Sequence, residues 1–376
     1  MIVLNALWDL LTYLGPFVFV LSLVVFVHEF GHFIVGRWCG VKVDAFSIGF
    51  GPEILAFVDR KGTRWRLAAL PLGGYVKFHG DASGASTIDR EAIAAMPESE
   101  RSVTFGAQKV WKRALIVVAG PAANFLLALV VFTATIYAYG RTELSPRVHA
   151  VAQGQAAAAA GFKAGDLVLS IDGAPIDSWA DLQRKVQDSP GLPLTIVVKR
   201  AGKDVTLVAT PRYRTINTIL GKSRVAMLGL DASSDPADIV VKRFTLPGSV
   251  GRAARQTWSV VAETGSFIGG VFEGRKSAAQ ISGPVGIARI SGKVARIGFV
   301  ALLNLAAILS ISIGLVNLAP VPLLDGGHLL YYALETARGR PLSERTQELG
   351  FRVGLGLVLA LMIFATFNDI LHLARS

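Results

Sequence analysis

Four long apolar segments constrain the fold of this chain more than any other feature. Each is about twenty residues long and carries few charges, which is the length that an α-helix needs to cross the hydrocarbon core of a bilayer. The segments lie at about Pro16–Gly36, Ala114–Tyr139, Phe299–Pro320 and Val353–Leu373. Over the whole chain 52% of the residues are hydrophobic and 17% are charged, which favours a membrane protein. We therefore predict a multi-pass α-helical membrane protein with about four transmembrane helices.

The first apolar segment contains a cluster of ionisable residues, His-Glu-Phe-Gly-His at His28–His32. Residues four apart lie on one face of a helix, so both imidazoles can hold a single ion. Glu29 follows the first histidine directly, where a general base for a water on that ion belongs. Without a metal, these groups would be poorly solvated and without evident partners at bilayer depth. The motif therefore predicts one catalytic Zn²⁺ held by His28 and His32, rather than structural histidines.

Asp325 is the candidate for a third ligand, because a catalytic zinc usually takes three protein ligands and keeps one position for water. It follows the third apolar segment within Asn317–Gly327, where Pro320 and Pro322 end the helix and let the chain turn back. The alternative interpretation is that the Asp-Gly pair forms only a turn.

Further polar residues lie inside or beside the apolar segments. Asn124 belongs to Gly120–Asn124, which we expect to open the second span, and it is placed to hydrogen-bond towards the site. Asn317 and Ser312 are candidates for stabilising an oxyanion, since amides and hydroxyls donate hydrogen bonds. Each of these side chains has the alternative role of joining neighbouring helices.

Residues 41–78, between the first two spans, have the pattern of short strands broken by turn residues. The predicted strands are Val43–Ile48, Ile54–Val58, Arg64–Leu70 and Gly74–Phe78. We expect a β-hairpin region that lies against the membrane. Its last strand would offer a substrate an edge made by Gly73, Gly74, Tyr75, Val76 and Lys77. The polar segment Asp81–Ser102 predicts a surface loop with a short helix.

Val148–Pro211 has the pattern of a compact soluble unit. Its predicted elements are a strand at Leu167–Ile171, a helix at Ser178–Gln187 and a strand pair of Leu194–Lys199 with Val205–Ala209. This pattern resembles a PDZ domain of the bacterial protease type, which implies an inserted α+β domain that binds peptide C-termini or extended segments. A small β-sandwich without a ligand is the alternative. Beyond it we predict a strand at Val225–Leu230 and a helix at Leu246–Glu273.

The charge of the chain favours contact with lipid rather than with nucleic acid. The formal net charge is +11, but the basic residues are scattered and do not alternate with aromatic residues. Local basic groups flank the spans, where they fit anionic lipid headgroups. Cys39 is the only cysteine, so no intrachain disulfide can form. Met1–Tyr13 lacks a basic region and a cleavage site, so we expect the first span to remain in the mature protein.

Five blocks of sequence together resemble the bacterial site-2 proteases, specifically the regulator of sigma-E protease type of intramembrane zinc metalloprotease. The blocks are His28–His32, Leu72–Lys77, Gly120–Asn124, Gly283–Ile287 and Asn317–Gly327. The resemblance implies that His28, His32 and Asp325 bind zinc and that Glu29 is the catalytic base. It also implies a membrane-reentrant β-hairpin and a periplasmic PDZ domain. One departure stands out, since better-known enterobacterial members carry two PDZ domains and this chain has one.

The resemblance also implies a domain plan, a location and a function. The predicted domains are 1–140 (N-terminal membrane half), 147–213 (PDZ), 214–297 (strand and amphipathic helix) and 298–376 (C-terminal membrane half). We expect a multi-pass protein of the bacterial inner membrane, with the active site near the cytoplasmic side. The implied reaction is regulated intramembrane proteolysis of single-span substrates, such as trimmed anti-sigma factors and signal-peptide remnants. A membrane zinc carrier and a non-catalytic PDZ scaffold remain as alternatives.

Overall fold

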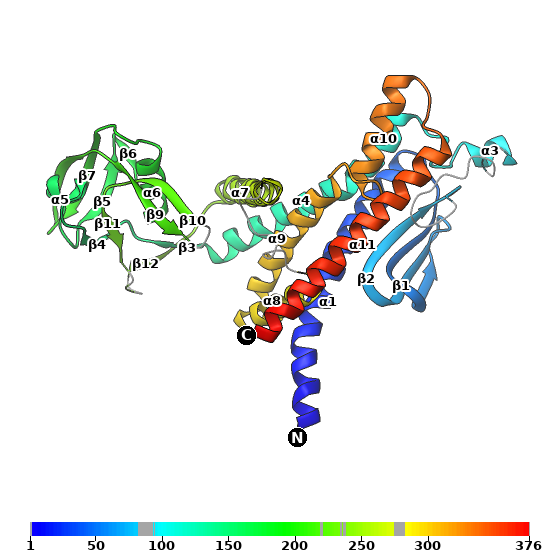
Figure 1. The fold of residues 1–376 in the computed structure, drawn as a ribbon, viewed down its shortest axis with the longest axis horizontal. Coiled ribbons are helices and arrows are strands. Elements are labelled where there is room, and N and C mark those ends of the chain that lie inside the picture. The colour runs from blue at the N-terminus through cyan, green and yellow to red at the C-terminus, as the bar shows by residue number, and fades with distance from the viewer. Residues whose placement is uncertain are drawn as a thin grey trace. The chain divides into compact units, whose positions relative to one another are not determined.

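The computed structural model describes residues 2–81, 93, 95–218, 221–233, 235, 238–273 and 283–375, and it divides into two compact units. The membrane unit comprises residues 1–135 and 246–376, and the inserted unit comprises residues 136–245. The helices of the membrane unit are α1 (Ile2–Trp38), α3 (Glu98–Arg101), α4 (Val110–Tyr139), α7 (Leu246–Phe272), α8 (Pro284–Ile297), α9 (Phe299–Asn317), α10 (Asp325–Arg338) and α11 (Glu344–Arg375) (Figure 1).

Among the described residues, four helices are long and apolar enough to cross a membrane. These stretches are Thr12–Trp38, Val110–Tyr139, Phe299–Asn317 and Arg345–Ile370, which agrees with the four predicted spans. One prediction about the second span is wrong, because α4 begins at Val110 and so Gly120–Asn124 lies in its middle. Pro121 is tolerated inside this helix, since neighbouring helices in a membrane protein satisfy backbone groups that a proline frees.

A small β-sheet packs beside α1 and consists of β1 (Val43–Val58) and β2 (Arg64–Phe78). Each strand bends, because Gly49 (φ +88°) and Gly51 (φ +86°) interrupt β1 and Gly73 (φ +150°) interrupts β2. A side chain at Gly49 would also lie 2.8 Å from a backbone oxygen of the facing strand.

The bends turn the two strands into four paired segments. Ile48 has two partners, Gly74 on one side and Leu67 on the other, so residues 43–48 lie in the middle of the sheet. The order across the sheet is 53–58, 64–70, 43–48 and 74–78, which reproduces the four predicted strands as parts of longer ones. The segment 74–78 is therefore one edge of the sheet.

Aromatic packing joins this sheet to α1. The ring of Phe33 on α1 lies 5.5 Å from the Phe46 ring and 5.0 Å from the Trp65 ring. At the end of α1, the Arg37 guanidinium donates to the Asp59 carboxylate at 2.5 Å, in the turn between the two strands. Because α1 and the sheet share a buried core and an ion pair, they behave as one body.

The inserted unit is built around a four-stranded sheet of order β6-β5-β7-β8, covered by α6. Its elements are β3 (Arg141–Leu144), β4 (Val148–Val151), α5 (Ala156–Ala159), β5 (Leu167–Ile171), β6 (Ala174–Pro175), α6 (Trp179–Gln187), β7 (Leu194–Arg200), β8 (Lys203–Ala209), β9 (Arg212–Thr218), β10 (Gly221–Met227), β11 (Leu230–Ala232) and β12 (Ile239–Lys242). The helix begins after Ser178, whose hydroxyl accepts the N–H of Asp181 and so caps it.

The inserted unit is wider than the predicted range 147–213. β3 pairs with β12 and β4 pairs with β11, so strands from both flanks close the unit. The predicted strand Val225–Leu230 is split between β10 and β11 at Gly229, which has a φ of +84°. The predicted helix at Leu246–Glu273 is present as α7 but belongs to the membrane unit. Most of the predicted loop at Asp81–Ser102 lies outside the described residues, and α3 is its short helix.

Candidate metal centre and active site

Three side chains from two helices converge inside the membrane unit. The Nε2 atoms of His28 and His32 lie 3.2 Å apart. Oδ2 of Asp325 lies 3.2 Å from the Nε2 of His28, and Oδ1 lies 3.6 Å from the Nε2 of His32. The structure thus brings the two predicted histidine ligands together with the predicted aspartate.

The second nitrogen of each imidazole has its own partner. Nδ1 of His32 lies 2.9 Å from the carbonyl oxygen of Ile116 on α4, so this nitrogen carries the proton and Nε2 keeps its lone pair. Nδ1 of His28 lies 3.2 Å from the amide of Asn124, which is fully buried. The Oδ1 of this amide has no partner among the described residues, and a half-turn of the amide would let Oδ1 accept the Nδ1–H of His28.

Asp325 reaches the histidines because of the turn that precedes it. α9 ends at Asn317, and α10 begins at Asp325 itself, so its carboxylate lies at a helix N-terminus, where negative charge is favourable. The turn is tight on the side of α10, since a side chain at Gly326 would collide with the backbone oxygens of Leu318 and Ala319. The two prolines therefore end the third span as predicted, and the glycines let α10 start against the turn.

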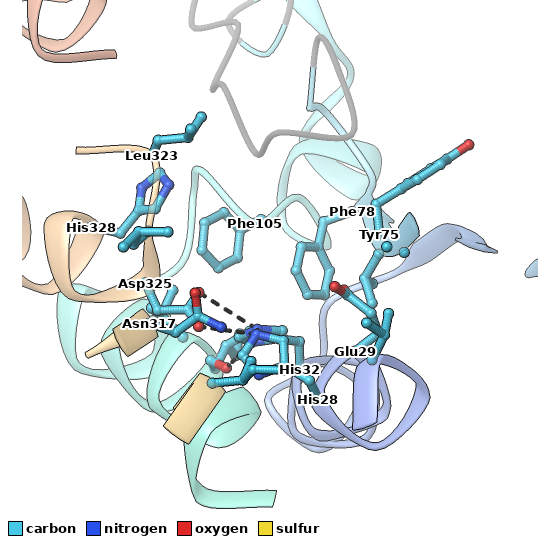
Figure 2. A pocket seen from close by; sticks show the side chains of 18 of the residues that line it. His28, Glu29, His32, Tyr75, Phe78, Phe105, Asn317, Leu323, Asp325 and His328 are labelled. Carbon is cyan, nitrogen blue, oxygen red and sulfur yellow. Dashed lines mark hydrogen bonds and ion pairs between the residues drawn. The ribbon is translucent and has the colours of Figure 1, made fainter. Parts of the chain in front are cut away.

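The cluster lines a cavity of about 530 Å³ in the membrane unit. Its walls include Val25, His28, Glu29, His32, Phe50, Gly73, Gly74, Tyr75, Val76, Phe78, Phe105, Asn317, Leu323, Asp325 and His328. In Figure 2 the imidazoles lie between Asp325 on one side and Glu29 on the other. A side chain at Gly74 would lie 3.1 Å from Cγ of Glu29, so the edge of the sheet passes directly beside this carboxylate.

The other predicted site residues divide into those that face the cavity and those that do not. Asn317 lines it, and Figure 2 shows its side chain beside Asp325. Asn124 lies behind His28 rather than in the wall. Ser312 does not line the cavity, and its hydroxyl donates to the carbonyl oxygen of Ile308 in its own helix. We therefore withdraw Ser312 as an oxyanion donor. Lys77 is also outside the cavity wall.

Two contacts at the site were not predicted from the sequence. Gly120 packs against the imidazole of His32 so closely that a side chain there would collide with Nε2. The Arg113 guanidinium on α4 donates to Glu335 on α10 at 2.7 Å and is almost fully buried, which fixes α10 against α4. Gly120 lies in a block that the sequence singled out, but the ion pair joins residues too far apart for a local pattern to find.

The donor set fits zinc. In a tetrahedral site with bonds of about 2.0–2.1 Å, ligand atoms lie about 3.3 Å apart, which is close to the spacings seen here. The buried Oδ2 of Asp325 has no hydrogen-bond donor among the described residues. Two imidazole lone pairs and a carboxylate at such distances repel each other unless a cation lies among them. Among the described residues, His28, His32 and Asp325 form the cluster whose side chains lie close enough together to hold a metal ion.

The helices, the cavity and the donor set define a membrane-integral metalloprotein. Comparison with known families gives the particular class, since residues 16–361 match the pattern of peptidase family M50. This chain belongs to peptidase family M50, the site-2 proteases, and is a metalloprotease that uses Zn²⁺.

Individual relatives agree with this assignment. A protein of Agrobacterium fabrum that carries the name zinc metalloprotease is 46% identical over 95% of each chain. A Rhizobium meliloti protein with the same kind of name is 45% identical over 98% of this chain and 99% of its own. Metalloprotease MmpA of Caulobacter vibrioides is 40% identical over 94% of each chain.

Proposed function

We propose that this chain is an intramembrane endopeptidase that performs regulated intramembrane proteolysis. In this proposal His28, His32 and Asp325 hold the zinc ion, and Glu29 is the catalytic base. The observation that carries it is that the three ligand atoms and Glu29 lie in one cavity, with His28, Glu29 and His32 on α1, a helix long enough to span a membrane. Ionisable residues at that depth are expected only where they face a protected interior and have a function.

The residues of the chain divide the chemistry among them. When bound, zinc supplies a Lewis acid that polarises a carbonyl and lowers the pKa of water towards about 7. Glu29 accepts a proton from the attacking water and passes it to the leaving amine. The amide of Asn317, which lies in the cavity wall, donates a hydrogen bond to the oxyanion of the scissile carbonyl. Asn124 and the Ile116 carbonyl orient the two imidazoles.

The edge strand 74–78 supplies the site for an extended substrate. A helical substrate hides its carbonyls in hydrogen bonds, so a stretch of it must unwind before cleavage. Strand addition at an open sheet edge stabilises such a stretch through backbone hydrogen bonds. This edge ends beside Glu29, so an added strand would run past the catalytic carboxylate. Gly73, Gly74, Tyr75 and Val76 carry this contact in our proposal.

Proline substitution on the two edges of the sheet tests strand addition. Tyr75→Pro removes a backbone N–H from the edge strand at the cavity, whereas Ala56→Pro removes one from the strand at the opposite edge and serves as the matched control. We expect cleavage to fall with Tyr75→Pro and to persist with Ala56→Pro, both with zinc retained. Equal cleavage by the two variants would remove the edge from the mechanism.

The sheet would also contact the membrane, because its opposite edge is strongly apolar and exposed. Ile54, Leu55, Phe57 and Val58 are each more than 60% exposed. Exposed apolar stretches of this kind are favourable only against lipid or a partner. We therefore keep the proposal that this hairpin is membrane-reentrant, in a protein of the bacterial inner membrane whose active site lies near the cytoplasmic side.

The proposed substrates are single-span membrane proteins already shortened by another protease, such as trimmed anti-sigma factors, and signal-peptide remnants. The inserted unit would be a periplasmic PDZ domain that excludes untrimmed ectodomains. The structure offers a clean deletion, because Arg141 pairs with Lys242 where the chain enters and leaves this unit. Replacing residues 142–241 with a short Gly-Ser linker should extend cleavage to substrates with intact ectodomains. Unchanged selectivity would count against gating.

The decisive experiment tests whether Glu29 is the base that cleaves a substrate within its membrane span. The purified protein in lipid is given a membrane-anchored reporter with one span, and Glu29→Gln is compared with the wild type. We expect this variant to bind zinc and to cleave nothing, because it keeps the ligands and loses the base. Normal cleavage by Glu29→Gln would refute the mechanism.

A further inference from the structure

The last helix of the chain touches the turn that leads to Asp325. A side chain at Gly354 on α11 would collide with the carbonyl oxygen of Pro322 and lie 2.6 Å from its carbonyl carbon and 3.2 Å from its Cβ. One turn earlier, a side chain at Gly350 would collide with the hydroxyl of Tyr331 and lie 3.5 Å from Cβ of Pro322. The helix therefore approaches this turn through two glycines on one face.

α10 contacts the same proline. A side chain at Gly327 would lie 2.7 Å from Cα of Pro322 and 2.8 Å from its nitrogen. Pro322 is thus in close contact with glycines of two helices. Atoms in close-packed contact cannot move independently, so a shift of α11 must move the turn.

The backbone after Pro322 has a conformation that needs such support. Leu323 has a φ of +92°, which is unusual for a residue with a side chain and is maintained only where the surroundings determine it. The turn itself contributes the bonds from Leu324 N–H to Val321 O at 3.0 Å and from Val321 N–H to Ala319 O at 2.7 Å. Asp325 follows two residues after Leu323, so the geometry of the turn sets the place of its carboxylate.

We propose that Gly350 and Gly354 are positioning residues, through which α11 holds the Pro322 turn and so sets the carboxylate of Asp325 within reach of the two histidines. This inference rests on the proposed role of Asp325 as a zinc ligand. It gives α11 a structural role, although most of its apolar stretch is exposed within the described structure.

Zinc affinity of the purified full-length protein, measured by competition with a chelator, tests the proposal without relying on cleavage. Gly354→Ala places a methyl group against a backbone carbonyl, which cannot turn aside as a flexible side chain can. Gly356→Ala is the matched control, because a side chain there meets nothing within 4 Å. Both substitutions favour the helix equally. We expect Gly354→Ala to weaken zinc binding about 10- to 100-fold, as other supporting groups of metal sites do, and Gly356→Ala to leave it unchanged.

A second pair of variants guards against simple misfolding. Gly350→Ala meets the hydroxyl of Tyr331, so Tyr331→Phe should restore zinc affinity in the double variant and should not restore it with Gly354→Ala. Asp325→Asn shows separately whether the aspartate is a ligand. Equal affinities of Gly354→Ala and Gly356→Ala, with Asp325→Asn impaired, would overturn the positioning role and leave the metal site intact. Normal zinc affinity of Asp325→Asn would instead overturn the ligand assignment, and with it this inference.

Discussion

Gly120→Ala should change helix stability and metal binding in opposite directions. An alanine in the middle of α4 stabilises the helix by about 0.5–1 kcal/mol relative to glycine. Its methyl group, however, would overlap Nε2 and Cε1 of His32 and lie 2.9 Å from Cδ2. Because carbon atoms approach non-bonded neighbours to about 3.5–4.0 Å, the imidazole must swing away from the other two ligands.

The expected loss follows from the number of ligands. Structural zinc sites with four ligands bind with about 10–16 kcal/mol, so one ligand contributes about 3 kcal/mol, or about a hundredfold in affinity. Chelator competition on the purified protein measures this directly. Gly15→Ala is the matched control, since it lies in α1 and a side chain there meets nothing within 4 Å. If Gly120→Ala binds zinc as tightly as Gly15→Ala, the close contact with the imidazole is not real and the reasoning fails.

Three further perturbations test other parts of the molecule. Asn124→Ala should weaken zinc binding about 10- to 100-fold, as measured by chelator competition, because the first histidine loses its orienting amide. Arg113→Ala leaves the largely buried Glu335 without its partner and should cost at most about 3–5 kcal/mol, seen as earlier thermal unfolding in detergent, with partial recovery when both residues are alanine. In the inserted unit, burial alone would raise the pKa of Asp166, but hydrogen bonds from Arg200 and a backbone N–H hold that pKa below its usual value. This carboxylate therefore stabilises the unit above about pH 4, and hydrogen exchange should show the protection falling as acid protonates it, with no such fall in Asp166→Asn.

The sequence predicted most reliably what depends on neighbouring residues. The four spans follow from local hydropathy, and the two histidines meet because a helix places residues four apart on one face. Four strand segments were also correct, since glycines and turn residues mark their ends. Their order was not predictable, because Ile48 pairs with residues on both sides and neither partner is close in sequence.

Features that depend on contacts between distant residues were predicted less well from the sequence. Ser312 was a candidate because its hydroxyl lies in an apolar helix, but only the structure shows that this hydroxyl bonds its own helix. The limits of the inserted unit were too narrow, since β3 and β12 join residues about a hundred positions apart. The contact of Gly354 with Pro322 could not be predicted for the same reason. Nothing in a run of apolar residues reveals which glycine meets a proline from a distant turn.

The two sources of the zinc ligands have a consequence for the cohesion of the membrane unit. The histidines belong to α1, which forms one body with the sheet, whereas Asp325 lies about 290 residues further along the chain on α10. A metal shared between them is a reversible cross-link, and a cross-link that closes a loop of this length is worth about 5–6 kcal/mol at most by chain entropy. Removal of zinc by a chelator would thus break this link between α10 and α1. Among the described residues, the Arg113–Glu335 ion pair would still join α10 to α4.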